Sequence, residues 1–270
     1  MRAILYKLYQ IFKQFFKLIL GLFKKKNFFS RFQKINDPRV LYILNQLRIN
    51  GYYVIEDYKN EQECELLLKE IDRIINENSN SKFYPESNDY RIYFADRKSS
   101  LITKFNVDKF LNEISNSFYN EFSSAFFTLA GLIYYKDNVL GSGGDWHRDI
   151  ALPGQFKTML YLSDVNENGP FEYIKGTQKD SSLFYGIWNC NLNAGAYRLN
   201  SKSVNSFLKS SKFDLVTFKA KKGTLIIFDS FGIHRGSPLK NGKRYALTNY
   251  YFKDKFINKN KSFLENKFKL

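Results

Sequence analysis

The sequence is poor in the residues on which many disulfide and metal sites depend. Its 270 residues include only two cysteines, Cys64 and Cys190, and their separation matches no metal-binding or disulfide pattern. We therefore expect free thiols and a reducing, cytoplasmic compartment. The chain also lacks internal repeats, a GxGxxG segment, a Walker loop and a CxxC pair. It thus shows none of the sequence signatures of dinucleotide-binding, P-loop or cysteine-zinc proteins.

Acidic residues are absent from the first 36 positions, which carry nine Lys or Arg. Residues 253–270 add six lysines against two acids, so most of the net charge of +16 belongs to the ends of the chain. The body between them carries only +3, which argues against a nucleic-acid-binding core. We divide the chain into a basic amphipathic segment over residues 1–36, one domain over 37–252 and a basic tail over 253–270.

Residues 4–25 have the periodicity of an amphipathic helix. Its lysines interrupt the apolar run too often for a transmembrane span or a signal peptide, and no A-x-A-like cleavage site follows. Two interpretations stay open. Either the helix lies in an anionic membrane surface, helped by the lysines at 24–26, or it packs on the protein's own sheet. The polar face consists of Lys7, Gln10, Gln14, Lys17, Gly21 and Lys24.

The rest of the chain has the composition of a folded domain. Apolar residues make up 44% of the sequence, with 27 Phe and 19 Tyr, which is ample for a packed core. Helical patterns come first, at 41–47, 61–78 and 107–119, and Gly51 is placed to end the first of them. Short strand-like runs separated by turn residues follow from position 126. The sequence predicts an α+β fold whose N-terminal helices pack on one antiparallel sheet. The strand-like runs are 52–55, 91–94, 126–135, 157–164, 171–174, 213–219, 223–228 and 244–252.

The chain has only two histidines, and both lie beside glycines at the ends of predicted strands. His147 stands two positions before Asp149, so an extended backbone would point both side chains to the same side. His234 lies 87 residues further on. Two histidines and one carboxylate form the ligand set of non-haem Fe(II) oxygenases. Arg244 follows on an adjoining predicted strand, where its guanidinium could hold a carboxylate by two hydrogen bonds.

In these features the chain resembles the phytanoyl-CoA dioxygenase-like Fe(II)/2-oxoglutarate oxygenases. The likeness covers about residues 45–252 in the family's order, which makes it more specific than any single motif. The matching segments are Gly51-Tyr-Tyr-Val-Ile55, the helix with Glu63-Cys-Glu65, Trp146-His-Arg-Asp149, Asp164-Val165 with Asn168-Gly-Pro170, Lys175-Gly-Thr-Gln-Lys179, Gly223 to Asp229, His234-Arg-Gly-Ser237 and Arg244.

The resemblance implies a double-stranded β-helix, the jelly-roll core of cupin-like proteins. It implies that His147, Asp149 and His234 ligate Fe(II), and that Arg244 pairs with the distal carboxylate of the cosubstrate 2-oxoglutarate. Ser237 is a further candidate contact of 2-oxoglutarate. The family's reaction releases succinate and CO2, and the presence of Asp149 favours hydroxylation, because halogenating relatives lack this carboxylate.

Other candidate residues keep two interpretations. Tyr134 and Tyr135 precede the metal segment on a predicted strand, and core packing competes there with a contact between Tyr134 and 2-oxoglutarate. Arg91, Arg97 and Arg198 either bind an anionic substrate or pair at the surface. The chain also departs from the family at Lys175-Gly-Thr-Gln, where the usual sequence is Pro-Gly-Ser-His. This difference predicts a changed rim of the site, and with it a changed substrate.

The leading hypothesis is a dioxygenase that hydroxylates a small or carrier- or lipid-linked metabolite. It is expected to be cytoplasmic and peripheral at the inner face of a membrane if residues 1–36 bind anionic lipid. One alternative is a non-catalytic, metal-binding cupin-like protein. Another is a nucleic-acid demethylase, but those relatives carry a further arginine six positions after the one corresponding to Arg244, and this chain does not. We therefore expect no nucleic-acid partner.

Overall fold

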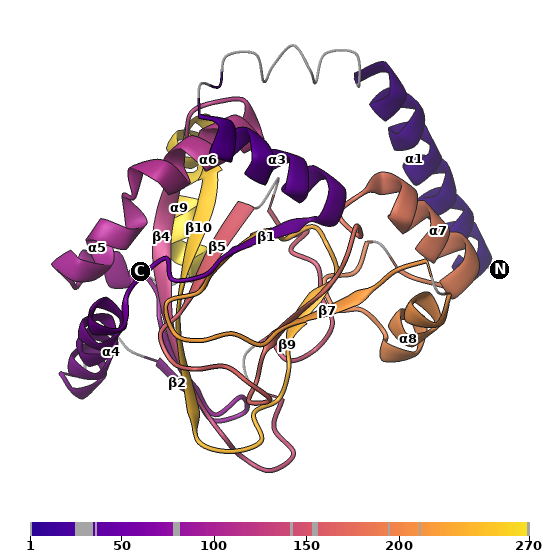
Figure 1. The fold of residues 1–270 in the computed structure, drawn as a ribbon. Coiled ribbons are helices and arrows are strands. Elements are labelled where there is room, and N and C mark those ends of the chain that lie inside the picture. Colours follow the sequence, from indigo (N-terminus) through magenta and orange to yellow (C-terminus); the bar gives the residue numbers. More distant parts are fainter. Residues whose placement is uncertain are drawn as a thin grey trace.

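Two antiparallel sheets face each other in the computed structural model of the protein (Figure 1). The major sheet has seven strands in the order β1-β8-β5-β10-β4-β3-β2, and the minor sheet has three in the order β7-β6-β9. The structure describes residues 2–24, 35, 37–77, 82–140, 143–152, 156–193, 195–210 and 212–268. The sequence-predicted features at Lys25, Lys26, Gly141 and Ser142 therefore lie outside the described residues.

The strands occupy nearly all the predicted runs. The predicted strand at 91–94 is shifted toward its N-terminal side, and β2 and β9 were not predicted. The strands are β1 Tyr52–Ile55, β2 Lys82–Tyr84, β3 Asp89–Ile92, β4 Ser123–Tyr134, β5 Phe156–Tyr161, β6 Phe171–Ile174, β7 Leu215–Phe218, β8 Leu225–Asp229, β9 His234–Gly236 and β10 Lys243–Lys253.

The central strands are apolar on both faces because each face meets a different layer. In β8, Leu225 and Ile227 join the cluster formed with the helices, whereas Ile226 and Phe228 join the cluster between the two sheets. Such a strand reads as a continuous apolar run rather than as an alternating one. The resulting double-stranded β-helix is the predicted jelly-roll core, and its interior between the sheets holds the candidate site.

Four helices cover the outer face of the major sheet; three of them were predicted, and the helix at 100–106 was not (Figure 1). Gly51 ends the first of them with a left-handed φ of 90°, a conformation that glycine adopts without strain. Asn60 and Glu63 form a reciprocal capping box at the start of the second. The four are α3 Pro38–Asn50, α4 Glu61–Asn76, α5 Ser100–Asn106 and α6 Lys109–Tyr119; a short 3-10 helix, η2 Ala95–Arg97, precedes α5.

The segment expected to be a basic tail contains a helix, α9 Asp254–Phe268. Leu264 is completely buried there in a cluster with Phe252 and Leu152. The lysines of α9 mask this apolar side in the sequence, because they alternate with it rather than forming a separate run. The C-terminal segment is therefore part of the packed domain rather than an appendage to it.

Two helices stand in the long connection between β6 and β7, α7 Asp180–Cys190 and α8 Ser201–Lys209. The N-terminal helix α1 Arg2–Lys24 lies alongside α7, and its described side chains are not part of the clusters that pack on the sheets (Figure 1). Packing on the protein's own sheet, one of the two interpretations of this helix, is thus wrong for the described residues, because α7 and the residues just after it provide their contacts. Within the described part of the chain, no helix is both long enough and apolar enough to cross a bilayer.

The burial of α9 predicts a difference between two neighbouring positions. Leu264→Ala should lower the free energy of unfolding by about 2–5 kcal/mol, because it leaves a cavity in a packed cluster. Phe263→Ala on the same helix, at a side chain that is 54% exposed, should change it by less than about 1 kcal/mol. Urea denaturation of both variants measures the difference, and equal stabilities would show that α9 does not hold this packing.

Candidate metal centre

Backbone pairing brings the two histidine segments together. His147 lies in the irregular segment after β4, and His234 opens β9. The amide of each donates to the carbonyl of the other, both at 3.0 Å, and the amide of Asp149 donates to the carbonyl of Ser230 at 2.9 Å. Residues 87 positions apart are thereby held in register, as in a short antiparallel ladder.

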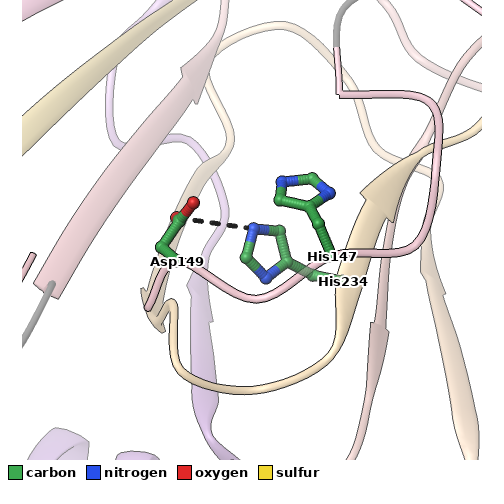
Figure 2. A group of neighbouring side chains, drawn as sticks. All are labelled: His147, Asp149 and His234. Atoms are coloured by element: carbon green, nitrogen blue, oxygen red, sulfur yellow. Dashed lines mark ion pairs between the residues drawn. The ribbon is translucent and has the colours of Figure 1, made fainter. Parts of the chain in front are cut away.

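The side chains of His147, Asp149 and His234 meet between the two sheets (Figure 2). One ligating atom from each lies within 4.8 Å of the other two, and all three residues are buried. The imidazole ring centroids are 4.2 Å apart, and Nε2 of His234 lies 3.7 Å from Oδ2 of Asp149. The structure thus brings together the three residues that the sequence selected as metal ligands.

Hydrogen bonds fix which imidazole nitrogens are free. Nδ1 of His147 lies 2.7 Å from the carbonyl of Asp145, and Nδ1 of His234 lies 2.9 Å from the carbonyl of Gly232. A carbonyl oxygen only accepts hydrogen bonds, so each Nδ1 carries the proton. Nε2 of each neutral ring then keeps its lone pair for an ion. Second bonds of this kind orient histidines in metal sites.

The protonation states of the three side chains suit a cation. Burial lowers the pKa of His147 and lowers the pKa of His234 to about 3, so both rings are neutral at pH 7. Burial by itself would raise the pKa of Asp149, but nearby Lys157 and the two histidines outweigh it and hold that pKa below its usual value. Two neutral nitrogen donors and one ionised carboxylate are the forms in which these residues bind metals.

Lys157 on β5 is a member of the site that the sequence analysis missed. Its ammonium lies 2.5 Å from Oδ2 of Asp149 and 4.0 Å from the ring centroid of Tyr250. Both partners of the Lys157–Asp149 pair are buried. The registers of β5 with β10 and with β8 bring Lys157 to this place, so no local sequence pattern could have indicated it.

A second buried ionic group supports the loop before His234. The guanidinium of Arg148 donates to the carbonyl of Phe231, and the backbone amide of Phe231 donates to the carboxylate of Asp229 at 3.0 Å. Burial raises the pKa of Asp229 to about 7, with the Phe231 amide and Arg148 opposing the shift. Gly232 is required in this loop, because a Cβ there would lie 1.8 Å from the Tyr173 hydroxyl.

The departure from the family at Lys175-Gly-Thr-Gln has a structural role. Thr177 is fully buried, and its hydroxyl accepts a hydrogen bond of 2.8 Å from the amide of Ile233, next to the second histidine. Gln178 donates to the carbonyls of Leu47 and Arg48 at the end of α3. This segment therefore braces α3 and the histidine loop.

A cavity of about 150 Å3 is lined by His147 and His234 and by four cationic side chains. Three of these have carboxylate partners: Arg91 pairs with Asp89, Lys157 with Asp149 and Arg235 with Glu172. Arg244 is the exception among the described residues that line the cavity. It is buried, it donates to the carbonyl of Gly169, and its Nε has no hydrogen-bond partner.

The unsatisfied Arg244 Nε indicates a missing acceptor. A buried donor without a partner costs free energy, so an anionic ligand in the cavity would satisfy it. A carboxylate suits the geometry of a guanidinium. The residues present therefore fit a metal ion held by His147, Asp149 and His234, together with a carboxylate ligand held by Arg244.

The remaining sequence candidates lie elsewhere. Tyr134 is 38% exposed at the end of β4, and neither it nor Ser237 lines the cavity. Arg97 pairs at the surface with Glu265. Arg198 lies beside the site without lining the cavity, since its backbone pairs with His147 and its side chain donates to the carbonyl of Asp145. Of the three arginines considered for an anionic substrate, only Arg91 lines the cavity.

The sequence profile of the phytanoyl-CoA dioxygenase (PhyH) family matches residues 47–246. No match was found among curated proteins. The fold is similar to that of the epimerase SnoN, whose structure contains Fe3+, alpha ketoglutarate and nogalamycin RO. The TM-score is 0.61 at 13% identity, over 80% of this chain and 85% of SnoN.

Two further structures are similar over comparable lengths. HygX from Streptomyces hygroscopicus, with nickel, 2-oxoglutarate and hygromycin B bound, gives a TM-score of 0.56 at 16% identity over 81% of this chain and 88% of its own. EctD from S. alaskensis, with 2-oxoglutarate and 5-hydroxyectoine, gives 0.59 at 18% identity over 78% and 74%. At identities this low, the structural similarity shows a common fold and nothing more.

The burial of the Lys157–Asp149 pair predicts a large effect of removing one partner. Lys157→Met should lower the stability of the metal-free protein by about 3–5 kcal/mol, because it leaves Asp149 buried without its cation. The matched control is Lys253→Met, which breaks a half-exposed pair with Glu121 and should cost less than about 1 kcal/mol. Chemical denaturation with and without Ni2+ measures both. Bound Ni2+ should reduce the loss of unfolding free energy in Lys157→Met. Equal losses in the two variants would contradict the view that the Lys157–Asp149 pair stabilises the fold.

The lowered pKa of His234 predicts the pH dependence of the metal-free protein. The ordinary pKa of 6.5 applies in the unfolded chain, and about 3 applies in the fold. Between these values the unfolded state binds the extra proton, so the contribution of His234 to stability is complete above about pH 6.5 and is lost as the pH falls. It should contribute a slope of about 1.4 kcal/mol per pH unit. His234→Gln should remove this slope from denaturation curves recorded between pH 4 and pH 7, and an unchanged slope would refute it.

Proposed function

This chain belongs to the phytanoyl-CoA dioxygenase (PhyH) family, and from that premise we propose that it is an Fe(II)- and 2-oxoglutarate-dependent dioxygenase. It hydroxylates a small or carrier- or lipid-linked metabolite and releases succinate and CO2. One observation carries the proposal: a buried group of two histidines and an aspartate adjoins a cavity in which a buried arginine lacks an acidic partner.

In this proposal His147, Asp149 and His234 hold the iron. Two neutral imidazoles and one ionised carboxylate are the ligand set of non-haem Fe(II) oxygenases, and iron held by it would also bind the cosubstrate and O2. When bound, the iron supplies the oxidative chemistry that couples decarboxylation of 2-oxoglutarate to oxidation of a C–H bond. Lys157 orients the carboxylate of Asp149 and compensates its charge, and the two Nδ1 hydrogen bonds orient the imidazoles.

Arg244 holds the distal carboxylate of 2-oxoglutarate in the proposal. Support comes from its burial, from its place in the cavity beside the metal group and from its unsatisfied Nε. Gly169 fixes the guanidinium from one side by accepting a hydrogen bond from Nη1. Contacts of Ser237 and Tyr134 with 2-oxoglutarate stay predictions. Their place outside the lining of the cavity does not support them.

Hydroxylation and the substrate class are the finer parts of the proposal. The presence of Asp149 favours hydroxylation over halogenation, because halogenating relatives lack this carboxylate. The similar structures contain small molecules, namely nogalamycin RO, hygromycin B and 5-hydroxyectoine, which supports a small-molecule substrate. A cytoplasmic location is supported by the two free, buried cysteines.

A non-catalytic cupin-like role is the alternative that a direct assay separates from this proposal. Purified protein supplied with Fe(II), 2-oxoglutarate and O2 should release succinate, slowly without substrate and faster with pools of metabolites. Binding of metal without any succinate release would favour the non-catalytic role. Acceleration by methylated oligonucleotides would favour nucleic-acid demethylation instead.

The role of Arg244 predicts a separation between cosubstrate and metal binding. Arg244→Ala should weaken 2-oxoglutarate binding by about 2–5 kcal/mol, a factor of tens to thousands, because a buried charge-assisted pair is lost. Ni2+ affinity should stay within about threefold of wild type, since a guanidinium does not ligate a cation. Titration calorimetry measures both constants.

Arg97→Ala is the control for this prediction, because Arg97 is half-exposed and pairs outside the cavity with Glu265. It should bind both ligands as the wild type does. If Arg244→Ala bound 2-oxoglutarate normally, the carboxylate would have to be held by another cation of the cavity.

A further inference from the structure

The N-terminal helix α1 docks onto the protein through its polar side. Nζ of Lys7 donates to Oδ1 of Asn191 and Nε2 of Gln10 donates to Oδ1 of Asn193, both at 2.6 Å. Nε2 of Gln14 donates to the Asp180 carboxylate at 2.6 Å, and the side chains of Gln10 and Gln14 are buried. These residues follow the spacing of one helix face. The face that a soluble helix normally turns to water is therefore the one turned inward.

The opposite side of α1 presents large apolar side chains to solvent. Phe12 is 70% exposed and Phe16 is 65% exposed. The surface continues onto α7, where Phe184 contacts Phe15 and stacks with the exposed Trp188. We call this surface the α1 apolar face; it consists of Leu5, Leu8, Tyr9, Phe12, Phe15, Phe16 and Trp188. A contiguous exposed patch of this kind marks a binding surface rather than a random scatter of apolar residues.

Charge indicates what covers this face. The first 36 residues carry nine Lys or Arg and no acid, and Lys13 is exposed on α1. A helix that combines exposed Phe, Leu and Tyr with basic residues has the composition of an interfacial membrane helix, and Trp and Tyr favour the headgroup region. The absence of acidic residues fits an anionic surface.

We propose that the α1 apolar face inserts into the surface of an anionic lipid bilayer, with α1 lying parallel to it. The polar contacts to Asn191, Asn193 and Asp180 attach the helix to the catalytic domain, so the domain is held against the membrane in one orientation. The membrane contact is independent of the proposed catalysis, because none of the residues of the α1 apolar face lines the cavity.

Flotation of full-length protein with lipid vesicles tests the proposal. Vesicles of phosphatidylcholine with about one-third phosphatidylglycerol should bind the protein, and vesicles of phosphatidylcholine alone should bind it much less. Binding should weaken when NaCl is raised from about 50 mM to about 500 mM, because salt screens the attraction. The double variant Phe12→Glu/Phe16→Glu should lower the partition into anionic vesicles at least about tenfold, since it places charges on the inserting face.

The matched control is Phe122→Glu/Phe263→Glu, which makes the same two substitutions at exposed phenylalanines outside α1. It changes the net charge equally and should keep most of the binding. Circular dichroism melts should be close to wild type for both variants, because all four side chains are exposed.

Three results would overturn the proposal. Wild-type protein that ignores anionic vesicles would do so, and so would equal binding by the two double variants. The third is a wild-type dimer in sedimentation velocity that Phe12→Glu/Phe16→Glu converts to monomer without any vesicle binding. That result would assign the face to a second copy of the chain.

Discussion

The reciprocal backbone bonds between His147 and His234 are the constraint on which the site depends. Two hydrogen bonds of 3.0 Å fix the separation of segments that are 87 residues apart in the sequence. Two neighbouring side chains stabilise the loop before His234 by hydrogen bonds. Thr177 binds the amide before His234, and Arg148 binds the carbonyl of Phe231. Because the histidine backbones are fixed, their rings need only one further hydrogen bond each to be oriented.

The buried charges follow from the same constraint. Placing three metal-binding side chains between two sheets removes them from water, which is tolerable only if charges are neutralised or paired. The histidines are neutral, and Asp149 pairs with Lys157. Arg244 is left as the cavity-lining cation, among the described residues, that forms no ion pair with a carboxylate of the protein, and its Nε has no hydrogen-bond partner. A site built in this way favours an anionic ligand next to a metal ion, which is the combination that the proposed reaction requires.

Periodicity indicated the N-terminal helix but not its packing, and it did not indicate the C-terminal helix α9. Residues 4–25 read correctly as an amphipathic helix, but the pattern could not show that Gln10 and Gln14 would face the protein. That choice was made by the partners available at Asn193 and Asp180, which belong to a distant connection. The helix α9 was read as a charged tail because Leu264 stands among lysines and gains its cluster only in the fold.

The sequence by itself determined most of the strand runs, three of the four helices laid on the major sheet, and the histidines, aspartate and arginine that stand out by rarity and order. These features depend on local periodicity and on residue chemistry, and both can be read from the order of residues in the sequence. Only the tertiary structure decided that Lys157 pairs with Asp149, that Tyr134 and Ser237 stay outside the cavity, and that α1 turns its apolar side outward. Each of these depends on the register of strands or on contacts between distant segments, and neighbouring residues in the chain carry no record of such contacts.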